Sequence, residues 1–170
     1  TNFKVLFMWM LMYVSYLLMG MSFMLLGLTG LMGYFQFTVW NANHIQFALI
    51  SSILYMFTET LIMFYFIITG KKIKEYIKEN QCDAELYRDV IKMKMKLFPH
   101  VTMNMIIVGA QFILGGAVHS GAFPGWAHGL MFDVALLHYM WVIIIQHNCF
   151  KENTELVITL HHQVQLNPAS

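Results

Sequence analysis

The stretch His44–Gly70, HIQFALISSILYMFTETLIMFYFIITG, decides the fold of this chain. It is about 27 residues of mostly apolar sequence, and at about 1.5 Å per residue it is long enough to cross a bilayer with some tilt. Its polar residues share about one-third of the helix circumference: His44, Ser51, Tyr55, Thr58 and Glu59. Because hydrocarbon cannot satisfy such a stripe, we expect it to face other protein or water.

Composition places the whole chain in the membrane class. Of its 170 residues, 58% are hydrophobic and 11% are charged, whereas soluble domains are about 25% charged. Eight of the ten Lys and Arg residues lie between Lys71 and Lys96. This basic segment has no accompanying aromatic platform, so we expect it to serve topology and anionic lipid rather than nucleic acid. We expect no nucleic-acid partner.

The sequence predicts an all-α integral membrane four-helix bundle forming a single domain over residues 1–170. The four spans are expected at about 5–33, 44–69, 99–118 and 126–150. A helical hairpin is expected over 71–98 and a polar tail over 151–170, with Pro99 in the first turn of the third span.

The first span carries a regular seam whose members step by four and three residues. A heptad step of this kind is typical of left-handed helix packing. The seam comprises Met8, Met12, Ser15, Met19, Ser22, Leu26, Thr29, Gly33 and Gln36.

The distribution of positive charge predicts the orientation. By the positive-inside rule, the basic segment and both termini lie on the cytoplasmic or mitochondrial matrix side. The uncharged short loops 34–43 and 119–127 then lie on the opposite, outer side. We expect the chain to reside in a bacterial cytoplasmic (inner) membrane or the mitochondrial inner membrane, with lipid and other membrane subunits as partners.

Histidines gather at two depths along the expected spans. His44, His119 and His128 fall within about one turn of the outer boundary, and His100 and His147 within about one turn of the inner boundary. Paired imidazoles from facing helices are what axial ligation of b-type haem requires. One hypothesis is therefore a redox subunit that pairs His44 with His128 or His119, and His100 with His147, and exchanges electrons with a quinone or an outer partner.

Two other hypotheses remain open. The expected arrangement of four spans is similar in architecture to four-helix membrane b-type cytochromes and to the membrane anchors of quinone-linked oxidoreductases, although no sequence motif carries that likeness. His44, His119 and His128 would equally suit a copper or zinc site, with Asp133 supporting it. In the remaining hypothesis the chain binds no cofactor and is a non-catalytic accessory subunit of a larger membrane complex. The sequence does not decide whether it is an enzyme, and it indicates no catalytic residue.

Three ionisable groups within the spans are candidates for a proton relay. Glu59 and Asp133 are the carboxylates inside the expected spans, and an intramembrane carboxylate is by default a functional candidate. His138 lies at about the depth of Glu59, so the two are expected to pair. The competing interpretation is that Glu59 binds Thr58, Tyr55 or a neighbouring helix and fixes packing only.

Overall fold

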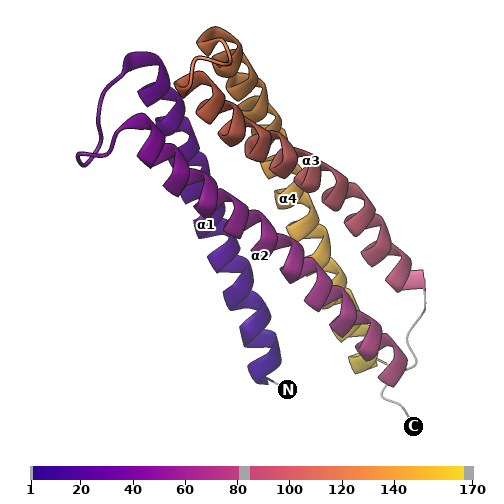
Figure 1. The fold of residues 1–170 in the computed structure, drawn as a ribbon. Helices are drawn as coiled ribbons and strands as arrows, with labels where there is room; N and C mark the ends of the chain where they lie inside the picture. Colours follow the sequence, from indigo (N-terminus) through magenta and orange to yellow (C-terminus); the bar gives the residue numbers. More distant parts are fainter. Residues whose placement is uncertain (1, 81–84, 167–170) are drawn as a thin grey trace.

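The structure is a computed structural model that describes residues 2–80 and 85–166, and it is all-α in those residues. It contains the helices α1 (Asn2–Phe35), α2 (His44–Glu79), α3 (Glu85–His119) and α4 (Gly125–Leu166) (Figure 1). All four are long and apolar enough to cross a membrane. The expected fold class is therefore confirmed as a bundle of four potential spans.

The helices pack as two hairpins, α1 with α2 and α3 with α4, which then meet through α2 with α3 and α1 with α4. The start of α1, the end of α2, the start of α3 and the end of α4 lie at one end of the bundle (Figure 1). The connections 36–43 and 120–124 lie at the other end, which we call the short-loop end. Neighbouring helices thus run in opposite directions, as the sequence predicted.

The polar and small seam of α1 faces the interior. Met12, Ser15, Met19, Ser22, Leu26 and Thr29 are all buried. Ser22 lies 2.9 Å from the Thr58 hydroxyl, and Thr29 lies 2.8 Å from that of Ser51. These two hydroxyl pairs join α1 to the polar stripe of α2, in which Ser51, Tyr55, Thr58 and Glu59 are fully buried. The buried residues confirm both predicted faces within the helices, whereas Gln36, the last member of the predicted seam, is exposed and follows the end of α1.

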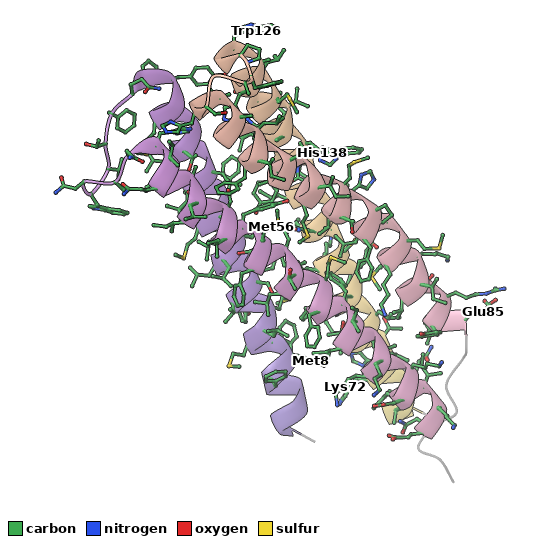
Figure 2. The ribbon with its side chains drawn as sticks, in the orientation of Figure 1. Met8, Met56, Lys72, Glu85, Trp126 and His138 are labelled. Carbon is green, nitrogen blue, oxygen red and sulfur yellow. The ribbon has the colours of Figure 1, made fainter. Side chains whose placement is uncertain are left out.

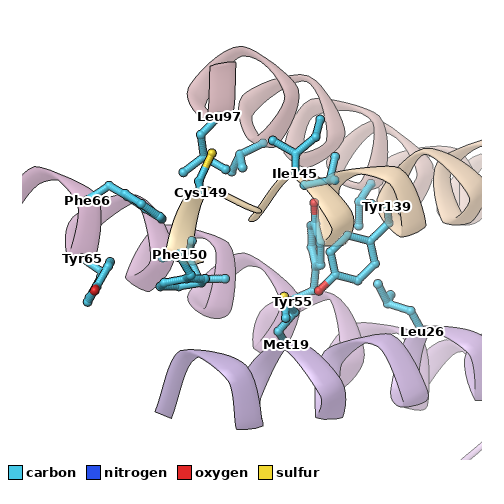
Figure 3. Close-up of a cluster of buried hydrophobic side chains, with 14 of the residues drawn as sticks. Met19, Leu26, Tyr55, Tyr65, Phe66, Leu97, Tyr139, Ile145, Cys149 and Phe150 are labelled. Carbon is cyan, nitrogen blue, oxygen red and sulfur yellow. The ribbon is translucent and has the colours of Figure 1, made fainter. Parts of the chain in front are cut away.

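The centre of the bundle is an aromatic core (Figure 3). Tyr55 of α2 and Tyr139 of α4 are fully buried and meet edge to face, with ring centroids 4.9 Å apart. Nearer the termini, Phe66 and Phe150 stack at 5.0 Å. Both ring pairs are contacts between α2 and α4 through the interior of the bundle, so they set which levels of these two helices face each other.

The helices are longer than the sequence analysis predicted. No break occurs at Pro99, which lies inside α3 rather than in its first turn, so the expected hairpin 71–98 is the continuation of α2 and α3. Proline removes the hydrogen bond to the carbonyl four residues earlier. Here that carbonyl belongs to exposed Met95, while Leu97 and Val101 on either side of Pro99 are fully buried and hold the helix in register.

The expected polar tail is also helical, because α4 continues through Leu166. The extended ends share a second apolar cluster that the central core does not reach. It comprises Ile73, Ile77, Val90, Met93, Leu156 and Leu160. An ion pair between Lys96 and Glu152, at 3.1 Å, borders it. The reason the tail folds is therefore tertiary: its apolar side chains cover those of α2 and α3.

Both short connections have local reasons for their shape. In 36–43 the backbone takes positive φ at Gln36, Trp40 and Asn41, and Asn43 then caps α2 in a reciprocal pair of hydrogen bonds with Gln46. In 120–124 the reversal uses Gly121 at φ 76°, a conformation that suits glycine. These turns fix where α2 and α4 begin.

The outer surface of the bundle is apolar on every helix. Large side chains such as Leu17, Ile53, Ile106 and Leu137 are more than 60% exposed, and Figure 2 shows many of them projecting outward. Helices that face lipid present this pattern. The fold is consistent with an integral membrane protein.

Candidate functional site

A cavity of about 710 Å³ lies between the two hairpins, toward the short-loop end. All four helices contribute to its wall, and its volume is within the range of about 300–1,000 Å³ that is usual for small-molecule sites. Most of the wall is apolar and includes Leu26, Val108, Phe112, Phe132 and Leu136. The polar wall residues include Thr29, Ser52, Gln111 and three histidines. The wall is thus of the kind that binds an apolar ligand through a few polar contacts.

The structure places His44, His119 and His128 together in the wall of this cavity. His44 opens α2, His119 ends α3, and His128 lies in the first turns of α4. His44 and His128 are partly buried and near enough to interact electrostatically, whereas His119 is exposed. The two partly buried imidazoles come from different hairpins, so a ligand in the cavity can contact both of them.

A glycine of a neighbouring helix lies against each of these two rings. A β-carbon at Gly33 would lie 3.1 Å from His44 Cε1, and one at Gly115 would lie 3.3 Å from His128 Cε1. Both distances are tighter than ordinary contact, so the rings occupy space that only glycine leaves open. The sequence analysis placed Gly33 in the seam of the first span but did not connect it with a histidine.

Gln111 of α3 fixes the hydrogen-bonding state of His128. Its Nε2 donates to the His128 carbonyl oxygen at 2.6 Å and lies 3.0 Å from His128 Nδ1. A carbonyl accepts only, so the amide nitrogen, not the amide oxygen, faces His128. Nδ1 then accepts the second N–H of Gln111, and the neutral imidazole carries its proton on Nε2. His128 therefore offers an N–H donor to a ligand in the cavity.

Two polar atoms at this site have no hydrogen-bond partner within the described residues, although both are buried. They are His44 Nδ1 and Gln111 Oε1. A buried polar atom without a partner costs about 1–3 kcal/mol, so a ligand or water that reaches either atom would gain from it. The histidine pair and Gln111 thus form one polar group in an apolar wall.

The three cavity histidines do not form a metal-ligand set in the structure. Across residues 2–80 and 85–166, no three His, Cys, Asp or Glu side chains are grouped to hold a metal ion. Asp133, the expected supporting carboxylate, lies on another face of α4 and accepts a hydrogen bond from the Tyr34 hydroxyl at 2.7 Å. The copper or zinc hypothesis therefore gains no geometric support.

The structure does not bring His100 and His147 together. His100 stacks on Trp141 at 4.6 Å, and its ring centroid is 6.2 Å from that of His138. His138, labelled in Figure 2, is in turn 3.0 Å from the amide of Asn104. His147 instead contacts the Tyr16 hydroxyl of α1 at 3.0 Å. The structure therefore does not support the expected inner haem held by His100 and His147.

Glu59 pairs with glutamine rather than with His138. Gln146 Nε2 donates to Glu59 Oε2 at 2.5 Å, and all atoms of both residues are inaccessible to solvent. Tyr139, whose ring also lines the cavity, is near enough to interact with the carboxylate. The sequence analysis missed Gln146 and Tyr139, although their spacing of seven residues on one expected helix placed them on a common face.

Comparisons with models of known protein families, with curated protein sequences and with solved structures found no match to this chain.

Proposed function

We propose that this chain is a membrane subunit of a redox complex, and that its cavity binds a lipid-soluble quinone. The observation that carries the proposal is the pair His44 and His128, which come from different hairpins and both lie in the wall of one apolar cavity of about 710 Å³. A quinone is a planar apolar ring with carbonyl oxygens at its two ends, so it needs one hydrogen-bond donor on each side. Partner subunits would exchange electrons with it.

The tautomer of His128 favours a carbonyl-bearing ligand over a metal. Because Gln111 donates to Nδ1, the His128 Nε2 carries a proton and can donate to a quinone oxygen. The same proton blocks Nε2 as a metal ligand, which must be unprotonated. The buried Nδ1 of His44, which has no hydrogen-bond partner within the described residues, is a second polar atom available at the site.

A b-type haem held by His44 and His128 is the second candidate. The observation that favours it is that two helices of different hairpins present imidazoles to one cavity. Ligation by His128 Nε2 would require the Gln111 amide to turn, so that its oxygen accepts a proton from Nδ1. That turn would sacrifice the 2.6 Å bond to the His128 carbonyl, which is why the quinone is preferred.

We place the cavity on the outer side of the membrane and both termini on the cytoplasmic or matrix side. The support is the basic segment Lys71–Lys96, which lies at the end of the bundle opposite the short loops. Single cysteines introduced at Asn41 and at Glu75, in a background without Cys82 and Cys149, test this with an impermeant thiol reagent. The reagent added outside should label only position 41, and labelling only at 75 would reverse the orientation.

One purification separates the candidates. The protein is isolated with its native lipid, and the sample is divided for solvent extraction with mass spectrometry, a reduced-minus-oxidised spectrum and metal analysis. Co-extracted quinone supports the proposal, and a haem spectrum supports the second candidate. A sample that binds neither, and that fails to bind an added short-tailed quinone, overturns both and favours the accessory subunit.

Variants of the cavity sharpen this test. His128→Phe keeps an aromatic ring and removes the donor, so the affinity for a short-tailed quinone should fall by about tenfold or more. His147→Phe is the matched control, because His147 is exposed and contacts Tyr16 rather than the cavity. Equal affinity in both variants would remove His128 from the site.

A further inference from the structure

Glu59 is a carboxylic acid without a counter-charge in the described structure. Its side chain is fully buried near the middle of α2, and the described groups around it are uncharged. A bare carboxylate in such surroundings is costly, and proteins neutralise one with a proton or with a bound cation.

The polar groups around Glu59 come from every neighbouring helix. Tyr55 lies on α2 itself and donates to Asn104 of α3, and Tyr139 comes from α4. On the α1 side, Ser22 and Thr58 bind each other. Of these groups only the two tyrosines titrate, and neither supplies a positive charge.

Three oxygen atoms of this cluster are buried and have no hydrogen-bond partner within the described residues. They are Glu59 Oε1, Gln146 Oε1 and the Tyr139 hydroxyl. An amide oxygen is an acceptor only, and an ionised carboxylate oxygen is too. The Tyr139 hydroxyl lies near the Glu59 carboxylate and carries one proton to donate, so it cannot supply both unpartnered acceptors, Glu59 Oε1 and Gln146 Oε1. The cluster therefore still lacks a proton or a hard cation, and carboxylate, carbonyl and hydroxyl oxygens are the ligands that hard cations prefer.

We propose that Glu59, Gln146 and Tyr139 form a binding site for one monovalent cation, H⁺ or Na⁺. One carboxylate calls for one positive charge, and Gln146 holds Glu59 Oε2 in place while Oε1 remains free to bind the cation. The site is separate from the histidines of the cavity, and it does not depend on which ligand the cavity takes.

Tyr139 connects this site with the cavity. Its ring forms part of the cavity wall, and it also interacts with the Glu59 carboxylate. The close-up in Figure 3 shows Tyr139 beside Tyr55 in the core between the helices. A cation that enters from the cavity therefore meets Tyr139 before Glu59, so Tyr139 controls its exchange.

Infrared difference spectroscopy of the full chain in lipid tests the site directly. The protonated carboxyl band of Glu59 is identified by its loss in Glu59→Gln, which keeps the side-chain volume. We expect this band to fall as the pH is raised. If the cation is H⁺ alone, sodium has no effect, whereas a Na⁺ site loses the band when sodium chloride replaces choline chloride at constant pH.

Two results would overturn the proposal. One is a Glu59 band that responds neither to pH nor to sodium, which would describe a permanently neutral packing residue. The other is a carboxylate that stays ionised with no cation dependence. If Glu59→Gln does not fold, labelling of the wild-type chain by a lipophilic carbodiimide replaces it. That reagent adds to protonated carboxyl groups, so raised pH or sodium should protect Glu59, and equal labelling under all conditions would contradict the site.

Exchange through Tyr139 has its own control. Tyr139→Phe keeps the ring in the cavity wall and removes the hydroxyl, so transfer of the Glu59 proton to D₂O should slow several-fold. Tyr55→Phe removes a neighbouring buried hydroxyl that donates to Asn104 instead. Equal exchange rates in the two variants would show that the cation does not pass Tyr139.

Discussion

Gly115 of α3 sets the position of the His128 ring on α4: a β-carbon at Gly115 would lie 3.3 Å from His128 Cε1. In the other hairpin, Gly33 of α1 has the same relation to His44 of α2, at 3.1 Å. Each imidazole thus rests on the bare backbone of the helix beside it. The lack of a side chain at Gly33 and Gly115 therefore helps to set the positions of the two rings, in addition to the hydrogen bond of His128 with Gln111.

Gly115→Ala should weaken ligand binding without removing any polar group. The added methyl pushes the His128 ring by a few tenths of an ångström, and we expect the quinone affinity to fall about three- to tenfold, or roughly 0.7–1.4 kcal/mol. Gly116→Ala is the control, since a β-carbon there meets nothing within 4 Å. Titration with a short-tailed quinone measures both, and equal losses would refute the steric explanation.

Gln111→Glu should exchange one ligand preference for another. A carboxylate at this position accepts a proton from His128 Nδ1, which frees Nε2 as a lone pair. Quinone affinity should therefore decrease, and affinity for added haem should increase. Gln111→Leu removes the hydrogen bonds to His128 without favouring the other tautomer. It should therefore weaken quinone binding and leave the affinity for haem unchanged. A rise in quinone affinity in the glutamate variant would show that the tautomer has been assigned the wrong way round.

Gly70→Ala should destabilise the contact between α2 and α3. A β-carbon at Gly70 would lie 2.8 Å from Cγ1 of Val90, which is buried and stiff, and 2.7 Å from Lys94 Nζ. Overpacking of this kind costs about 1–3 kcal/mol. Gly27→Ala meets nothing within 4 Å and serves as the control. Unfolding in mixed micelles gives the free energy of unfolding of both variants. Equal values would contradict close packing of α2 against α3 at Gly70.

Ser22→Ala should cost little, although it breaks a buried hydrogen bond between helices. The Thr58 hydroxyl, 2.9 Å away, keeps its bond to the Leu54 carbonyl, so no donor is stranded. Bonds of this type average about 0.6 kcal/mol in membrane proteins. The control is Thr60→Val, which alters an exposed hydroxyl on α2, the helix of Thr58, and should leave the stability unchanged. A loss above about 2 kcal/mol for Ser22→Ala would show that the two hydroxyl pairs act as a network.

The interior faces were predictable because burial in a membrane bundle follows helical periodicity. Ser22 of α1 and Thr58 of α2 each belonged to a predicted face, and both are fully buried. Helix length was harder to predict. The third span was expected to start at Pro99 and the fourth to end at about 150. Instead, α3 begins at Glu85 and α4 continues through Leu166, because contacts distant in sequence hold these ends. Local signals carry no information on such contacts.

The sequence indicates the level of each polar residue along its helix, but the level alone does not determine which residue it contacts. His138 and Glu59 were expected to pair. Instead, His138 lies against the amide of Asn104, and Glu59 accepts a hydrogen bond from Gln146. Tyr139 interacts with Glu59, whereas His138, one residue earlier, lies about 100° around α4 from Tyr139. A polar residue in an apolar run does not encode its partner. The same limit applies to His100 and His147, which lie beside different helices.

The unbroken length of α2 has a mechanical consequence. Its 36 residues span about 54 Å, well beyond the hydrocarbon thickness of about 30 Å, and no turn interrupts them. One continuous helix therefore connects the cavity wall, through His44 and Ser52, with the lysine-bearing end that begins at Lys71. The two ends of the bundle are joined by a single rigid element, so neither end of α2 can change its orientation without moving the other.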